Sequence, residues 1–177
     1  MRFRLDFKKI ERPQVDFAYD INLYNTDLLT DIFVPELSLE NGTRLKGQYQ
    51  GDKANFSMFL ESNMVRWEKM VFSNVTINAD HADSLRSLKC KVGSFSIGKN
   101  NIDSISLYSN LMSDSVWFET KGIFRDSIDS YFRLKGYAFD VGTPENEEYT
   151  IYLADGRFNV GNNYFDLLPD NLIHITP

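Results

Sequence analysis

The sequence predicts an all-β fold, a long antiparallel meander with one short helix near residues 26–33. Three observations predict it. Apolar and polar residues alternate along most of the chain, which is the period of a strand with one buried face. Clusters of Gly, Asn, Asp and Ser, which favour turns, separate these stretches. The hydrophobic fraction of 42%, with 14 Phe and 9 Tyr, lies far from the composition of disordered chains.

Length, charge and cysteine content limit the possible functions. A chain of 177 residues is long enough to bury a core, and we expect a single unit over residues 1–177. With 25 acidic residues against 19 basic ones, the net charge of -6 argues against nucleic acid as a partner, because binding phosphates requires concentrated positive charge. The single cysteine, Cys90, lies in a strand-like alternation, which favours a thiol of the apolar core.

The clearest strand pattern covers residues 15–24, where every second residue from Val15 to Leu23 is apolar. Residues 1–8 alternate as well, so the chain opens in a predicted strand and resembles a segment cut from a longer protein. No run of about 18 apolar residues is present to predict a membrane-spanning helix. Further alternations predict strands at residues 45–49, 56–60, 75–79, 88–92, 105–111, 116–124, 132–138 and 149–153.

Residues 26–33 carry the only convincing helical pattern. Asn25 or Thr26 can cap its start, and Pro35 ends it. The apolar residues of this segment share one face of the helix: Leu28, Leu29, Ile32 and Phe33.

Two turns in the first half of the chain allow a prediction of strand register. A three-residue loop at 40–42, with Gly42 in the left-handed conformation of a bulge, would set Leu39 against Thr43 and Leu37 against Leu45. A four-residue loop at 51–54 would join the next two strands. Its pairs would be Tyr49 with Phe56, Gly47 with Met58 and Leu45 with Leu60, which together form one apolar face.

A third hairpin is predicted around a loop at residues 126–130. It would pair Phe124 with Phe132 and Gly122 with Leu134, again on an apolar face. The opposite, solvated face would carry Glu119, Lys121, Arg133 and Lys135. The pattern Phe-x-Ile/Val-Gly recurs at residues 95–98 and 158–161, which suggests that strand-sized units are reused.

The sequence contains no convincing catalytic or metal-binding pattern. Asp80-His81-Ala82-Asp83 is interpreted as a loop, because ligands so close in sequence seldom converge on one ion, and His174 as an exposed residue of a strand. Nucleophile elbows, phosphate-binding loops and Cys-x-x-Cys pairs are absent from the sequence. We therefore predict a protein that is not an enzyme, with no cofactor and no metal.

Two segments carry a family resemblance. Residues 33–49, FVPELSLENGTRLKGQY, resemble a P-x-L-x-loop-T-x-L-x-G-x-Y segment of TamB-like proteins of Bacteroidetes. Residues 164–175, YFDLLPDNLIHI, resemble a segment that recurs in the same proteins. About thirty residues carry the resemblance, and the remainder of the chain is compatible with it.

The resemblance implies the AsmA-like, repeating β-groove superfamily. Its members have an inner-membrane helix and a long periplasmic sheet, curled into an open β-taco, whose apolar interior carries lipid acyl chains between membranes in support of outer-membrane assembly. TamB partners TamA, an outer-membrane barrel of the BamA type. This chain would then be an internal stretch of periplasmic groove wall. Its partners would be acyl chains, flanking segments of the parent chain and, through parts outside this chain, such a barrel.

We expect the groove to be lined by apolar residues of the predicted hairpins: Leu45, Tyr49, Phe56, Met58, Leu60, Phe118, Phe124, Phe132 and Leu134. Three alternatives remain open at this point. The apolar faces could pack on each other in a β-sandwich that serves as a scaffold or spacer. The strands could close into a lipocalin-like barrel around one small ligand. A carbohydrate-active enzyme could use a carboxylate pair, although no pair stands out.

Overall fold

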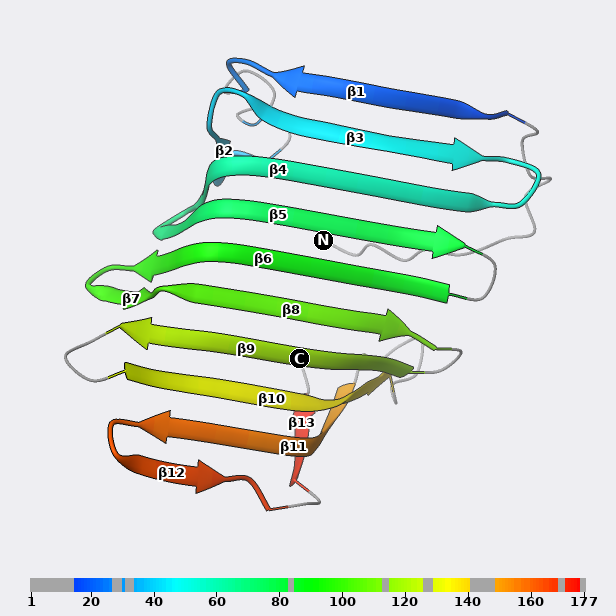
Figure 1. The fold of residues 1–177 in the computed structure, drawn as a ribbon. Helices are drawn as coiled ribbons and strands as arrows, with labels where there is room; N and C mark the ends of the chain where they lie inside the picture. Colours follow the sequence, from blue (N-terminus) through cyan, green and yellow to red (C-terminus); the bar gives the residue numbers. More distant parts are fainter. Residues whose placement is uncertain are drawn as a thin grey trace.

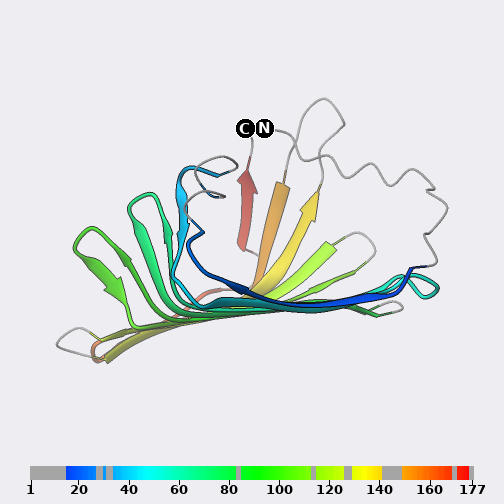
Figure 2. The ribbon, with the colours of Figure 1, turned by 90° about the horizontal axis from the view of Figure 1, so that it is seen from above.

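The protein forms one open, curled antiparallel sheet of 13 strands (Figures 1 and 2). The structure is a computed structural model. It describes residues 15–26, 30, 34–82, 85–112, 115–125, 129–140, 149–168 and 171–175. Nearly all of these residues lie in strands, as the alternation of apolar and polar residues predicts.

The strands vary from three to 13 residues in length. In chain order they are β1 (Phe17–Leu23), β2 (Leu37–Leu39), β3 (Thr43–Gln50), β4 (Asn55–Trp67), β5 (Met70–Ala82), β6 (Leu85–Ile97), β7 (Asn100–Ile102), β8 (Ser104–Leu111), β9 (Ser115–Arg125), β10 (Asp129–Asp140), β11 (Tyr149–Val160), β12 (Asn163–Asp166) and β13 (Asn171–Ile175).

The order of the strands in the sheet is that of a meander. The main path runs β1-β3-β4-β5-β6-β8-β9-β10-β11-β12, while β2 pairs with β4, β7 with β6 and β13 with β11. β1 and β12 lie at opposite ends of this path and do not pair, so the sheet is not closed and the lipocalin-like barrel is wrong. All 13 strands belong to one sheet, so the described residues do not form a two-layer sandwich either.

Two predicted elements fall largely outside the described residues. The strand expected at residues 1–8 lies entirely outside them. Most of the helix expected at residues 26–33 does too, although Thr26, Thr30 and Val34 are described. Thr30 N donates to Thr26 O at 2.9 Å, and Val34 N donates to Thr30 O at 2.7 Å, which are the i to i-4 hydrogen bonds of a helical turn.

The hairpin with the loop at residues 51–54 has the predicted register. Tyr49 lies opposite Phe56, Gly47 opposite Met58 and Leu45 opposite Leu60. The two resembling segments at residues 95–98 and 158–161 are also equivalent in structure. Each ends at a glycine of positive φ, Gly98 or Gly161, which begins a tight turn into a short strand.

The predicted hairpin around residues 40–42 is wrong. Gly42 does adopt the expected left-handed conformation, with φ of +84°, but β2 and β3 do not pair with each other. Both pair with β4, and Leu39 lies opposite Val65 rather than Thr43. The turn therefore does not reverse the chain. β2 and β3, on its two sides, pair with different parts of the same strand, β4.

The predicted register of β9 and β10 is displaced by two residues. Phe132 lies opposite Gly122, and Leu134 lies opposite Thr120. The physical reason is the space above Gly122, where the Phe132 ring occupies the volume that a β-carbon would need. A shift of two residues leaves the faces unchanged, so Lys121 and Arg133 still share the opposite face, as predicted.

β4, β5 and β6 bend near their middle, where a residue with a left-handed backbone lies beside a glycine of the next strand. Asn74 has a φ of +52°, and the regular pairing of β5 is interrupted at this residue on both sides. Gly93 lies opposite Asn74 on β6, where a β-carbon would come within 2.9 Å of the Asn74 Cβ. Figure 2 shows the β4-β5 and β6-β7 hairpin ends curling up from the plane of the sheet.

The inside of this bend is the most buried part of the sheet. Thr43 and Ser62 share a hydrogen bond of 2.7 Å between their hydroxyl oxygens and are 1% and 2% exposed. Val75 and Val92 continue this row on β5 and β6 and are buried as well. Side chains on the inside of a corner are crowded by both halves of their strands. The face that carries these four residues is therefore the concave one.

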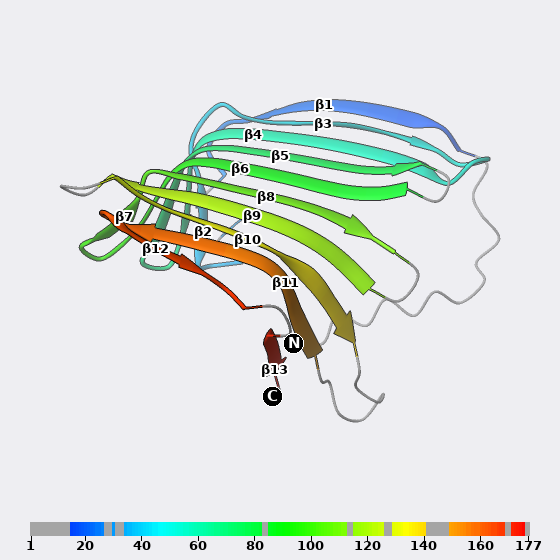
Figure 3. The same ribbon diagram turned by 60° about the horizontal axis from the view of Figure 1, so that its bottom comes forward.

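The opposite end of the strands bends toward the same side. Between Lys135 and Gly136 the register of β10 and β11 shifts by one residue, which is a β-bulge at Ala154. Figure 3 shows one end of β10 and β11 curving away from the sheet, together with β13. With both ends bent, the sheet forms an open trough.

We predict that the bend depends on the left-handed backbone at Asn74. Asn74→Val should lower the free energy of unfolding by about 1–3 kcal/mol, because a β-branched residue is strained at positive φ. Asn74→Gly should preserve stability. The matched control Asn78→Val, in the regular part of β5, should stay within about 0.5 kcal/mol of wild type. Urea unfolding measures all three, and equal losses at both positions would contradict the prediction.

Candidate functional site

The middle of the concave face is apolar across the width of the sheet. Residues directly opposite each other in adjacent strands share a face, so the register defines rows that cross the sheet. One such row crosses nine strands without a charged side chain. From β1 to β11 it consists of Ile21, Leu45, Leu60, Ile77, Cys90, Leu107, Thr120, Leu134 and Gly156.

The predicted lining residues all lie on this concave face, in two groups. Leu45, Tyr49, Phe56, Met58 and Leu60 lie side by side on β3 and β4. A second group, on β9 and β10, consists of Phe118, Phe124, Phe132 and Leu134. The residues that connect the two groups, Ile77, Cys90 and Leu107, were not among the predicted lining residues. Their alternation with polar neighbours could have identified them.

The described residues cover little of the concave face. Only two hydrophobic residues of the described chain are buried, Val75 and Val92, and every predicted lining residue is half-buried. Phe17 near one edge of the sheet is 53% exposed, and Phe165 near the other is 57% exposed. Monomeric proteins seldom leave a continuous apolar surface of this width open, and larger exposed apolar patches are typical of interaction sites.

Glycines allow large side chains to lie flat on this face. Tyr19 lies over Gly47, and Phe132 lies over Gly122, each from an adjacent strand. Leu167, which follows β12, occupies most of the space above Gly156, and Leu134 of the adjacent strand contacts it too. A β-carbon at any of the three positions would push its neighbour up from the sheet, so the glycines keep the floor of the trough smooth.

Ion pairs gather on the opposite, convex face. Arg44 forms two hydrogen bonds with Asp20, at 2.9 and 2.7 Å, and Arg157 contacts Asp166 at 2.7 Å. Glu119 accepts from Lys121 and Arg133, and these two hydrogen bonds hold the pKa of its carboxyl below the usual range. The middle of the sheet thus separates an apolar face from an ionic one. Near one end of the strands, His81 and the exposed Arg86 belong to the concave face.

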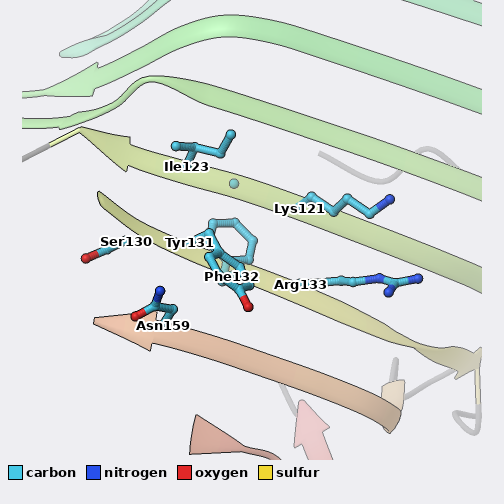
Figure 4. A pocket seen from close by; sticks show the side chains of 8 residues that line it. Lys121, Ile123, Ser130, Tyr131, Phe132, Arg133 and Asn159 are labelled. Atoms are coloured by element: carbon cyan, nitrogen blue, oxygen red, sulfur yellow. The ribbon is translucent and has the colours of Figure 1, made fainter. Parts of the chain in front are cut away.

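One hollow lies on the convex face, to which most of its lining side chains belong: Lys121, Ile123, Tyr131, Arg133 and Asn159. It has a volume of about 670 Å³ and lies between β9, β10 and β11 (Figure 4). The side chains of the apolar row are mostly half-buried, so the trough is a broad open surface. A broad surface suits long, flexible apolar chains better than a compact ligand.

The two histidines take different positions. Asp80 and His81 belong to β5 and point to opposite faces, so the interpretation of residues 80–83 as a loop is wrong for the described part of this segment. His174 is exposed on β13, as predicted, and its Nδ1 lies 3.0 Å from the Thr150 hydroxyl. Within the described residues no three His, Cys, Asp or Glu side chains are grouped to hold a metal ion.

Comparison of the chain with family profiles, curated proteins and solved structures gives no match. The described part of the chain also contains no helix of the length and apolarity needed to cross a bilayer. The concave face is consequently the main guide to function.

We predict that the position of Cys90 on the concave face slows the alkylation of its thiol. Burial raises the pKa of its thiol above the ordinary value, so the folded chain holds less thiolate than the unfolded chain at the same pH. Alkylation by iodoacetamide should be slower in the folded chain than in urea, and its rate should continue to rise with pH beyond the point where the unfolded chain reaches its maximum. Identical rate profiles for the folded and unfolded chains would contradict this placement of Cys90.

Proposed function

We propose that the concave face binds lipid acyl chains and conducts them, as a non-enzymatic stretch of groove wall in a TamB- or AsmA-like protein of the periplasm. The observation that carries the proposal is the apolar row from Ile21 to Gly156, which is only partly covered in the described chain. Eight steps between strands, of about 4.8 Å each, give this row a length of roughly 38 Å. One leaflet of a bilayer core is about 15 Å deep, so the row is longer than the depth that an acyl chain occupies in a leaflet.

The expected affinity suits transport. Full burial of a methylene contributes about 0.8 kcal/mol, so ten methylenes lying half-covered on an open face contribute roughly 4 kcal/mol. That corresponds to binding in the millimolar range for one chain and the micromolar range for a lipid with two chains, before the costs of association. Lipids held this weakly would exchange readily.

The chemistry of the row also favours movement along it. Its polar members are a threonine hydroxyl and a thiol, Thr120 and Cys90. A headgroup would find no charged partner within the row, so a bound chain would meet similar surface at each strand. Uniform apolar contact supports sliding rather than capture at one point.

The proposal includes partners outside this chain. β1 and β12 have unpaired outer edges in the described sheet, and such edges offer backbone donors and acceptors to another strand. We assign these edges to flanking segments of the parent chain, which would extend the trough, and the parent would be anchored in the inner membrane. Contact with a barrel of the BamA or TamA type would use parts that lie outside this chain.

A structural role is the second candidate. The same uncovered face and open edges could be covered by other parts of the parent protein, so that the sheet serves as a scaffold or spacer. A protein that melts cooperatively and binds no hydrophobic dye would favour this role. Acyl-chain binding is preferred because the row stays free of charge across nine strands, which a scaffold does not require.

Photo-crosslinking residues at Leu45 and Leu134 test the proposal in cells that express the envelope protein. Both positions lie on the concave face and should label lipid. Lys46 and Lys135, one residue away on the convex face, are the matched controls and should label several-fold less. Equal labelling at the two sets of positions would contradict acyl-chain binding in the trough.

A further inference from the structure

The convex face carries a row of cations in register. Lys91 on β6, Lys121 on β9, Arg133 on β10 and Arg157 on β11 lie in one cross-strand row, with Ser106 of β8 between the first two. Lys121 is directly opposite Arg133, and Arg133 is directly opposite Arg157. Like charges in directly opposite positions destabilise a sheet. Lys121, Arg133 and Arg157 follow one another directly, so positive charge is concentrated in this row. A bound anion would reduce the repulsion between them.

Neighbouring carboxylates neutralise this row only in part. One oxygen of Glu119 serves two cations, with Lys121 Nζ at 3.0 Å and Arg133 Nε at 2.8 Å. Asp166 contacts Arg157, and Asp155 lies 3.9 Å from Lys135 of the next row. We define the cationic patch by the described charged side chains on this face of β6 to β12: Lys89, Lys91, Lys121, Arg133, Lys135, Arg157, Glu119, Asp155 and Asp166.

The cationic patch differs sharply from the rest of the protein. Its six cations and three carboxylates give it a net charge of +3, while the whole chain carries -6, so the remaining residues carry -9. An anionic surface would therefore attract one part of this face and repel the remainder of the molecule. That asymmetry would orient the protein on such a surface.

The hollow of about 670 Å³ adjoins the patch and adds an apolar component (Figure 4). Lys121 and Arg133 lie at one end of the hollow. Tyr131 and Ile123 line it, and Ile123 is 46% exposed. Tyr164 on β12 is in register with this group and is 66% exposed. Cations beside tyrosine and an exposed aliphatic residue are typical of surfaces that sit among lipid headgroups.

One further group in the hollow lacks a partner. Oδ1 of Asn159 is buried at the end away from the cations, and nothing among the described residues donates a hydrogen bond to it.

We propose that the cationic patch docks the convex side of the sheet on an anionic membrane surface, with lipid phosphates against Lys91, Lys121, Arg133 and Arg157. The row spans four steps between strands, or roughly 19 Å, enough for several headgroups. This docking does not depend on acyl-chain binding, because the trough opens on the opposite face. Each net cation near an anionic leaflet favours binding by roughly five-fold, so the net charge of +3 supplies on the order of 100-fold.

Flotation with lipid vesicles tests the docking. The chain should float with vesicles that contain about one third phosphatidylglycerol in phosphatidylcholine and should stay behind with pure phosphatidylcholine. Binding should be lost at about 1 M salt, where the Debye length falls to about 3 Å. The double substitution Lys121→Gln with Arg133→Gln should weaken binding by roughly 25-fold, the product of two five-fold factors.

Two further pairs of substitutions isolate the contribution of the cationic patch. Arg44→Gln with Lys46→Gln removes two cations of the same face outside the patch and should leave flotation nearly unchanged. Lys121→Glu with Arg133→Glu reverses both charges and should abolish flotation, while circular dichroism verifies that each variant is folded. Equal flotation with neutral vesicles, an equal loss in the Arg44 and Lys46 control, or binding to DNA but not to vesicles would overturn the proposal.

Flotation and the crosslinking experiment together distinguish this inference from acyl-chain binding. If lipid crosslinking at Leu45 and Leu134 is absent while flotation is intact, only the proposed function is contradicted. If flotation is absent while crosslinking is intact, only the docking is contradicted.

Discussion

The structure depends on strand register. Ten strands follow one another along the main path of the sheet, and their pairing extends one period-two pattern of apolar and polar residues across it. A slip of one residue between any two strands would place charges such as Lys46 or Lys121 on the apolar side. The trough, the cationic patch and the separation between them all follow from this single constraint. Short loops, such as residues 51–54, fix the register locally.

Bends in the strands give the sheet a concave face. Asn74 with its left-handed backbone, Gly93 opposite it and the bulge at Ala154 bend the strands at two places in the same direction. The bend buries Val75 and Val92 beside Thr43 and Ser62, whose hydroxyls lie within hydrogen-bonding distance of each other and of the carbonyls of Glu40 and Met64. The result is a sheet in which apolar side chains converge without being sealed, a suitable arrangement for a flexible occupant.

Much of this could be predicted from the sequence, but with a defined limit. Alternation identifies strands and faces, and a short loop between facing apolar residues fixes the pairing of Leu45 with Leu60. Alternation is insensitive to a shift of two residues, which is why Phe132 was expected opposite Phe124 and lies opposite Gly122. A left-handed glycine such as Gly42 fits both a hairpin and a turn after which the chain continues along the same neighbouring strand. Only the pairing of Leu39 with Val65 decides between the two. The net charge of -6 likewise conceals the cationic row, because only register aligns residues as distant as Lys91 and Arg157.

Native mass spectrometry of the gently extracted protein tests most directly whether the concave face holds acyl chains. If it does, phospholipid adducts should be present on the folded chain. Their abundance should fall when Leu134→Asn and Leu60→Asn place amides in the row, and should persist when Lys135→Asn changes the convex face. A folded chain with the bare polypeptide mass under the same conditions, or adducts that are insensitive to the row, would contradict acyl-chain binding.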